Sequence, residues 1–101
     1  MITEVSASVR AVNPRMLESV PRIFVTVDFA NHSPRTLVVD SFRLLWGGAE
    51  FVEKDVGVIL PANESASKTV ELNTTNIPDP AATRVEILAT HEPSWWERLW
   101  K

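Results

Sequence analysis

The chain has 101 residues, of which 45% are hydrophobic and 23% are charged. This composition is that of a globular protein, and the length holds one domain and excludes two independent cores. The net charge is −3 and the arginines are scattered along the chain, so the concentrated basic face of a nucleic-acid-binding protein is not indicated. Because cysteine is absent, disulfides, cysteine-ligated zinc and a thiol nucleophile are excluded.

The sequence indicates neither a membrane-spanning helix nor an export signal. No apolar run approaches the roughly 20 residues that cross a bilayer, and residues 1–10 alternate polar and apolar without the apolar stretch of a signal peptide. As the sequence stands we expect a cytoplasmic protein, and the alternative of a domain cut from a longer exported protein stays open.

Alternation of polar and apolar residues, the period of a half-buried strand, dominates the N-terminal third of the chain. Residues 3–12 predict a strand whose apolar face carries Val5, Ala7, Val9 and Ala11. Residues 13–21 hold two prolines and predict a loop with room for one helical turn.

Residues 22–30 predict the most regular strand, and the turn-forming residues 31–34 follow it. The core face of this strand carries Ile23, Val25, Val27 and Phe29.

The next predicted strand, residues 36–46, contains a break in its alternation. Its apolar residues fall in two sets, which are Leu37 and Val39 on one side and Phe42, Leu44 and Trp46 on the other. One inserted residue reverses the face on which the following side chains lie, so a β-bulge at Asp40–Ser41 would bring both sets together. We therefore predict a bulge or a change of sheet at that point, with Trp46 in the core or packed at an edge.

The C-terminal half predicts four further strands separated by turn residues. Gly47-Gly48 predicts a tight hairpin. The strands are expected at residues 49–53, 56–60, 65–72 and 83–90, with a loop at 73–82. In the last strand Val85, Ile87 and Ala89 share one face.

Six or seven short strands at regular spacing, without a helical period anywhere, predict an all-β fold. We expect an immunoglobulin-like antiparallel β-sandwich of six to seven strands at residues 1–92. A tryptophan-rich tail at residues 93–101 follows it and has the pattern of a short C-terminal helix.

Residues 22–72 show a familiar order of features. A strand ends in Asn31, a turn contains Pro34, and a long strand, a glycine hairpin, an apolar segment ending in Pro61 and a polar-alternating strand follow. This order resembles the water-stress and hypersensitive-response domain of the late-embryogenesis-abundant type, and is similar to bacterial immunoglobulin-like and fibronectin-like accessory domains. The resemblance implies a non-enzymatic β-sandwich that protects or contacts other macromolecules, and it supplies no site residues. In that family proline directly follows the turn asparagine, whereas here it comes three positions later.

The parts that a catalytic site requires are missing from the sequence. There is no Gly-x-Ser-x-Gly elbow, no glycine-rich phosphate loop and no pair of carboxylates in an apolar context. We therefore expect neither enzymatic activity nor a cofactor.

His32 and His91 would meet at one end of the sandwich if the strands alternate up and down, with Glu64 or Glu92 as further metal ligands. Two solvated loop histidines are the simpler interpretation, because zinc ligands normally come in recognisable pairs.

The least ordinary feature is the tail, which holds three of the four tryptophans. Ser94 and Glu97 have the spacing of a helix capping box, and on such a helix Trp95–Leu99 and Trp96–Trp100 would be neighbours. The tail could cover one end of its own sandwich, dock into a partner chain or a second copy, or lie at a membrane interface. The candidate partner-binding residues are Trp95, Trp96, Leu99 and Trp100.

Three functions fit these features. The first is an interaction module that binds a protein partner, or a second copy, through the tail or an exposed strand edge. The second is a stress-protective, anti-aggregation domain, and the third is a small-ligand or carbohydrate-binding module that uses Trp46 and the terminal tryptophans. Nucleic acid is not expected, and contact with a membrane surface is weakened because the tail has only two basic residues, Arg98 and Lys101.

Overall fold

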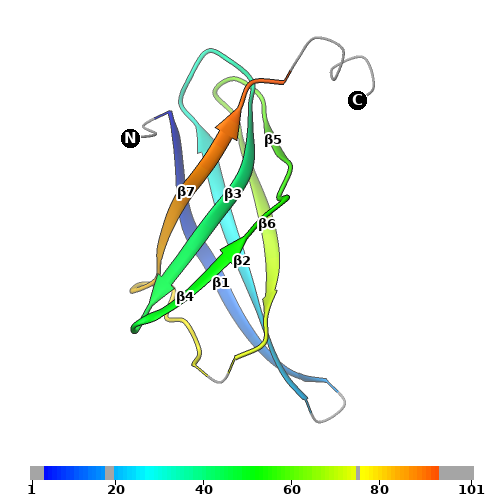
Figure 1. Ribbon diagram of the computed structural model, residues 1–101, viewed down its shortest axis with the longest axis vertical. Coiled ribbons are helices and arrows are strands. Elements are labelled where there is room, and N and C mark those ends of the chain that lie inside the picture. The colour runs from blue at the N-terminus through cyan, green and yellow to red at the C-terminus, as the bar shows by residue number, and fades with distance from the viewer. Residues whose placement is uncertain (1–3, 18–19, 75, 94–101) are drawn as a thin grey trace.

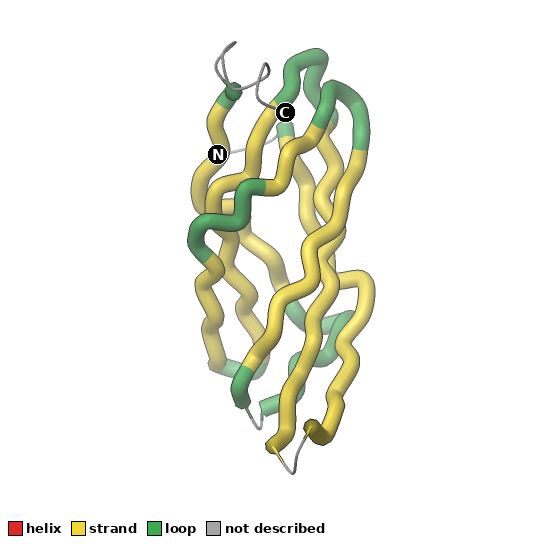
Figure 2. The backbone as a smooth tube through the Cα atoms, turned by 90° about the vertical axis from the view of Figure 1, so that its right-hand side faces the viewer, coloured by secondary structure: helices red, strands yellow, loops and turns green. Residues whose placement is uncertain are grey.

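The computed structural model describes residues 4–17, 20–74 and 76–93, and within them the chain forms strands and loops only (Figures 1 and 2). The strands are β1 (Val5–Leu17), β2 (Val20–Asn31), β3 (Leu37–Trp46), β4 (Ala49–Glu53), β5 (Val58–Leu60), β6 (Ser65–Leu72) and β7 (Arg84–His91). The described part of the chain contains no helix long and apolar enough to cross a membrane.

The seven strands form two antiparallel sheets packed face to face (Figure 1). One sheet has the order β1-β2-β6. In the other sheet β3 is central, with β7 along one side and β4 and β5 along the opposite side. The predicted all-β sandwich is therefore confirmed, and the inner strands of the two sheets are β2 and β3.

The hydrophobic core lies between β2 and β3, and its side chains come from the predicted apolar positions of both strands. Phe29 and Phe42 meet across the two sheets edge to face, with 5.5 Å between their ring centroids. The core-facing residues of β2 are all buried, and they are Ile23, Val25, Val27 and Phe29. β1 joins this core through Val5, which is also buried.

The predicted irregularity in β3 is confirmed. The pairing of β3 with β7 shifts at Asp40–Ser41, and β7 shifts at Leu88. As a result both apolar sets of β3 enter the core, and these are Leu37 and Val39 before the bulge and Phe42, Leu44 and Trp46 after it. The bulge thus resolves a sequence whose alternation changes phase in the middle of a strand.

Two expectations for the N-terminal region are wrong. Residues 13–21 do not form a loop with a helical turn, because β1 and β2 continue as a long hairpin whose last described pair is Leu17 and Val20. Proline is tolerated there because β1 is an edge strand and Pro21 lies beyond the residues of β2 that pair with β6. A bulge between Val9 and Ala11 also changes the phase of β1, so that Val12 packs against the core instead of Ala11.

The glycine hairpin forms as predicted. Gly47 and Gly48 have φ angles of 48° and 80°, and they connect the paired residues Trp46 and Ala49. Positive φ at both central residues is the requirement of a type I′ turn, which matches the twist of the strands it joins. The predicted strand at 56–60 is shorter than expected, because residues 54–57 lie outside the ladder and β5 has only three residues.

Candidate functional site

One end of the sandwich collects the turns that the sequence places at a common pole. The amide of Asn31 donates to the carbonyl of Glu64 at 2.9 Å, and the amide of Asn63 donates to the carbonyl of Ser33 at 3.2 Å. The side chain of Arg35 lies 3.4 Å from the carboxylate of Glu92, just after β7. The predicted meeting of these three chain segments is therefore confirmed.

Asn31 lies at the centre of this pole and is 2% exposed. Its Nδ2 donates to the carbonyl of Arg35 at 2.7 Å and to that of Leu60 at 2.9 Å. Its Oδ1 accepts from the amide and the hydroxyl of Ser33 at 2.9 and 2.8 Å. Both ends of the amide are thus satisfied by backbone and hydroxyl partners, which makes Asn31 a clamp between the β2–β3 and β5–β6 loops.

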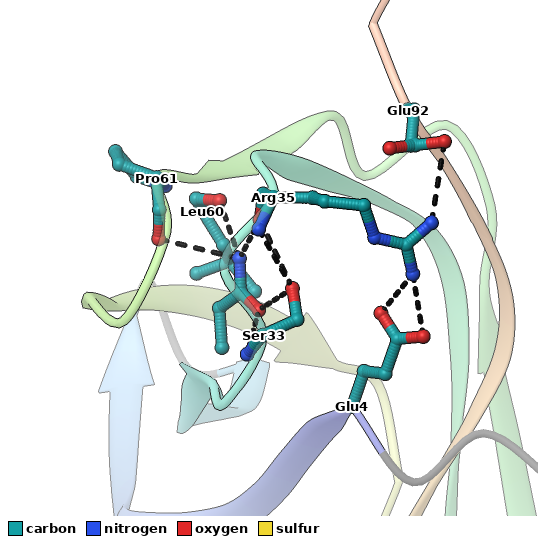
Figure 3. A network of polar contacts seen from close by, with 7 residues as sticks. Glu4, Ser33, Arg35, Leu60, Pro61 and Glu92 are labelled. Carbon is teal, nitrogen blue, oxygen red and sulfur yellow. Dashed lines mark hydrogen bonds and ion pairs between the residues drawn. The ribbon is translucent and has the colours of Figure 1, made fainter.

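An ion-pair bridge lies beside this clamp. The guanidinium of Arg35 binds the carboxylate of Glu4 at the start of the chain and faces that of Glu92 (Figure 3). The hydrogen bonds that Arg35 donates to Glu4, and then the negative charges of both glutamates, raise the pKa of Arg35 above its ordinary value. All three side chains are about half exposed, so these ion pairs contribute little to the free energy of folding. They join the β2–β3 loop to the residues just before β1 and just after β7.

The two histidines lie against different partners. The Nε2 of His32 is 2.8 Å from the hydroxyl of Ser6, and the Nδ1 of His91 is 2.8 Å from both carboxylate oxygens of Asp40. Within the described residues no group of three or more histidine, aspartate or glutamate side chains could hold a metal ion. The geometry that the metal hypothesis requires is therefore not formed by this part of the chain.

Trp46, one of the rings invoked for carbohydrate stacking, lies in the core. It is 7% exposed, and its indole Nε1 donates to the carbonyl of Asn76 at 2.9 Å. A stacked sugar requires an open ring face, so Trp46 cannot provide a platform. Packing in the core, the other role predicted for this residue, is confirmed.

A hollow of about 560 Å³ lies on the outer face of the β1-β2-β6 sheet, over small side chains such as Ser6, Ser8 and Ser67. Asp28 lies in it and accepts a hydrogen bond from the Nε of Arg10 at 2.8 Å through Oδ2. Its Oδ1 is shielded from solvent and has no hydrogen-bond partner among the described residues. The hollow is broad and open, and small polar side chains of this kind are common on the solvent face of a sheet.

The outer edge of β7 is the most distinctive surface of the described residues. β7 has eight residues and pairs with β3 along one side, and no described strand pairs with its other side (Figure 1). The outer side of an edge strand carries backbone donors and acceptors that can serve as a template for a further strand.

The other edges of the two sheets are less open to pairing. β1 carries a bulge after Val9 and a proline at position 14, and both features discourage a neighbouring strand. β4 and β5 have only five and three residues, and β5 contacts β6 across the gap between the sheets. β6, the outer strand of the β1-β2-β6 sheet, also has eight residues without proline, but its core-facing Val70 and Leu72 are buried and it contacts β5. β7 is therefore the eight-residue edge whose core-facing side chains are only partly covered.

The apolar side chains beside β7 are incompletely covered. Val85 and Ile87 pack against the core, yet no residue of β7 is fully buried. Across the sandwich, the core-facing residues Ala7, Val9 and Val12 of β1 are likewise only partly buried. On the opposite side Leu60 of β5 and Leu72 of β6 are 0% and 2% exposed. Core-facing side chains are thus more completely buried at Leu60 and Leu72, beside β5 and β6, than along β7 and the middle of β1, although β1 and β7 also contact each other. We call the side between β1 and β7 the β1/β7 seam.

Ion pairs hold the outer face of β7 against β3. The guanidinium of Arg43 on β3 binds Glu86 through Nε at 2.9 Å and also through Nη2, and it reaches Glu50 of β4 at 3.3 Å. Arg84 lies 3.4 Å from the other oxygen of Glu86. The hydrogen bond from Arg43 lowers the pKa of Glu86 below its ordinary value of 4.5, against the opposing effect of partial desolvation.

This lowered pKa predicts a pH-dependent difference between the protein and its Glu86→Gln variant. A carboxylate whose pKa is lower in the folded state stabilises the fold above its unfolded pKa, and the contribution is lost as the pH falls through the folded value. In urea unfolding, the variant should be less stable at pH 7, and the difference should shrink as the pH falls below 4.5. Glu64→Gln, at an exposed turn position, is the control and should change stability little at either pH. A difference for Glu86→Gln that stays constant from pH 7 to pH 3 would contradict the role of the charge.

The tail residues Trp95, Trp96, Leu99 and Trp100 lie outside the described residues, so their predicted role in partner binding stays a prediction. The β1/β7 seam was not located from the sequence, because the order of the strands within the two sheets was not predicted. Comparison of the chain with protein-family models, with curated proteins and with solved structures found no match to any of them.

Proposed function

We propose that this domain is a non-catalytic protein-interaction module, with an immunoglobulin-like arrangement of strands, that accepts an extended segment of a partner protein along β7. The observation that supports the proposal is the coincidence of a β7 edge, beside which no described strand pairs, with the partly covered apolar side chains Val85 and Ile87 of the β1/β7 seam. Backbone hydrogen bonds to the edge would give affinity, and side chains directed into the seam would give specificity.

Each contact between β7 and the partner segment is expected to contribute a modest amount of binding free energy. A backbone hydrogen bond contributes about 0.5–1.5 kcal/mol net, and covering apolar surface adds about 25 cal/mol per Å². Several such bonds, less the cost of ordering the partner, correspond to a transient interaction and not to a permanent complex. The tail is a second candidate contact, which leaves the domain just after β7.

A peptide library tests this function even though the natural partner is unidentified. Random ten-residue peptides displayed on phage are selected against the domain and then tested against two proline variants, Val85→Pro and Glu86→Pro. Adjacent positions of an antiparallel ladder alternate in direction, so one of these prolines removes an amide that faces away from β3 and spares the ladder. The variant that keeps its circular dichroism spectrum and unfolding midpoint should lose the selected peptides.

Removal of residues 94–101 is the matched test of the tail. Peptides that bind the β7 edge should bind the shortened domain as well as the full chain. Retention of all selected peptides by the folded proline variant would contradict the β7 edge as their binding site. Loss of them only on removal of the tail would assign binding to Trp95, Trp96, Leu99 and Trp100 instead.

A further inference from the structure

We propose, on the basis of the proposed function, that the segment bound at β7 comes from a different protein and has apolar residues at alternate positions with an acidic residue opposite Arg84. Three features of the β7 edge lead to this chemistry: the direction of its apolar side chains, the charge that it leaves exposed, and the change of phase along its length.

The apolar requirement follows from the β1/β7 seam. Val85 and Ile87 face the core because they pair with Leu44 and Phe42, which are completely buried. A strand added beside β7 has the same pleat, so every second side chain of it would point toward this layer. Apolar side chains at those alternate positions would cover Val85 and Ile87 together with the partly buried residues of β1.

The acidic requirement follows from the charges on the other face of β7. Glu86 is held by two nitrogens of Arg43, so its charge is already compensated. Arg84 is 72% exposed, and its ion pair with Glu86 is long at 3.4 Å. A carboxylate on the neighbouring strand would therefore find an accessible guanidinium at Arg84, and opposite charges directly across a ladder are favourable.

A second copy of β7 would not place an acidic residue opposite Arg84. Ile87 and Thr90 lie on the same face, because their partners Phe42 and Val39 both lie in the core, so the alternation of β7 changes phase at Leu88. Two copies that pair along the whole strand about a two-fold axis normal to the sheet would set Val85 opposite Thr90, and both of these residues face the core. The same register sets Arg84 opposite His91 of the other copy, so a carboxylate opposite Arg84 has to come from a strand of different sequence.

The tail of the same chain is also a poor match to this edge. A paired strand needs a two-residue period, whereas the apolar residues of the tail lie at positions 95, 96, 99 and 100. Adjacent tryptophans would project onto opposite faces of a strand, and only one of them could enter the β1/β7 seam.

Three synthetic octapeptides test the inference on the full-length protein. The first alternates valine with glutamate and threonine, the second replaces glutamate with lysine, and the third has the composition of the first with its valines placed together. Binding is followed by ¹⁵N chemical shifts and amide hydrogen exchange, with the amides of β4 as the internal reference. We expect protection of β7 amides by the first peptide, about threefold weaker binding of the second at low salt, and no protection by the third.

Variants separate this inference from the proposed function. Arg84→Gln should abolish the preference for glutamate over lysine, whereas Arg22→Gln, at an exposed arginine on β2, should preserve it. Equal binding of the first two peptides with protection of β7 would overturn the acidic requirement and leave the proposed function standing. Failure of all three peptides, together with failure of the library to yield β7 binders, would overturn both.

The second copy and the tail are outcomes of the same measurements. Sedimentation of the protein alone should show a monomer, and a dimer with protected β7 amides would overturn the exclusion of self-pairing. If β7 amides are already protected in the protein alone and lose protection when residues 94–101 are removed, the tail occupies the edge and the inference is wrong.

Discussion

Replacement of Asn31 by alanine should lower the free energy of unfolding by about 3 kcal/mol. The substitution removes a buried amide that accepts from Ser33 and donates to the carbonyls of Arg35 and Leu60. Each buried group left without a partner costs about 1–3 kcal/mol, and the hydroxyl of Ser33 can recover one bond because it already lies near the carbonyl of Arg35. Urea unfolding followed by circular dichroism measures the loss.

A matched control separates the clamp from a general effect of losing asparagine. Asn73→Ala removes an exposed amide in the loop after β6 and should change stability by less than about 0.5 kcal/mol. In the Asn31→Ala variant, amide exchange should accelerate first at residues 32–35 and 61–64, because the clamp joins these two loops. Equal effects of the two substitutions would show that the hydrogen bonds of Asn31 add nothing beyond those that water supplies.

The central strands were predictable from the sequence because their burial is decided by the strands themselves. β2 alternates regularly between the two faces, and every one of its expected core residues is buried. The phase change in β3 was also predictable, because apolar residues at 39 and 42 can share a face only if one residue bulges out of the ladder.

The edges were harder to predict because their structure depends on what lies beside them. Pro14 and Pro21 predict a loop by local preference, and only the tertiary position of these residues at unpaired edges permits a strand. The bulge after Val9 left no clear sign in the sequence, because Ala11 and Val12 are both apolar.

The β1/β7 seam could not be located from the sequence for a related reason. Val85 and Ile87 have the same pattern as buried strand residues, and their partial burial depends on the absence of a described strand beyond β7. Alternation shows which face of a strand points inward, but it does not show whether a neighbour covers that face. An edge strand therefore resembles a core strand in its sequence until the order of the strands is known.

The clearest test of the β3 bulge is the pair of adjacent substitutions Phe42→Ala and Arg43→Ala. Phe42 is fully buried and lies edge to face with Phe29, so its truncation should cost about 4 kcal/mol through lost burial and a cavity. Arg43 points to the outer face, where it binds Glu86, and its truncation should cost a small fraction of that amount. Without the bulge the order would be reversed, because Arg43 would share the face of Val39.

A loss of about 4 kcal/mol approaches the whole stability of a small domain, so Phe42→Leu provides a milder second measurement. It should retain a cooperative unfolding transition and cost less than Phe42→Ala, because most of the apolar volume remains. Combining it with Phe29→Leu in a double-mutant cycle isolates the aromatic contact, with an expected coupling of about 0.5–1.5 kcal/mol. A coupling near zero would mean that the two rings stabilise the core separately by burial.

A larger loss of stability for Arg43→Ala than for Phe42→Ala would contradict the phase of β3. It would also contradict the register that places Ile87 on the core face and leaves Leu88 as the extra residue of β7.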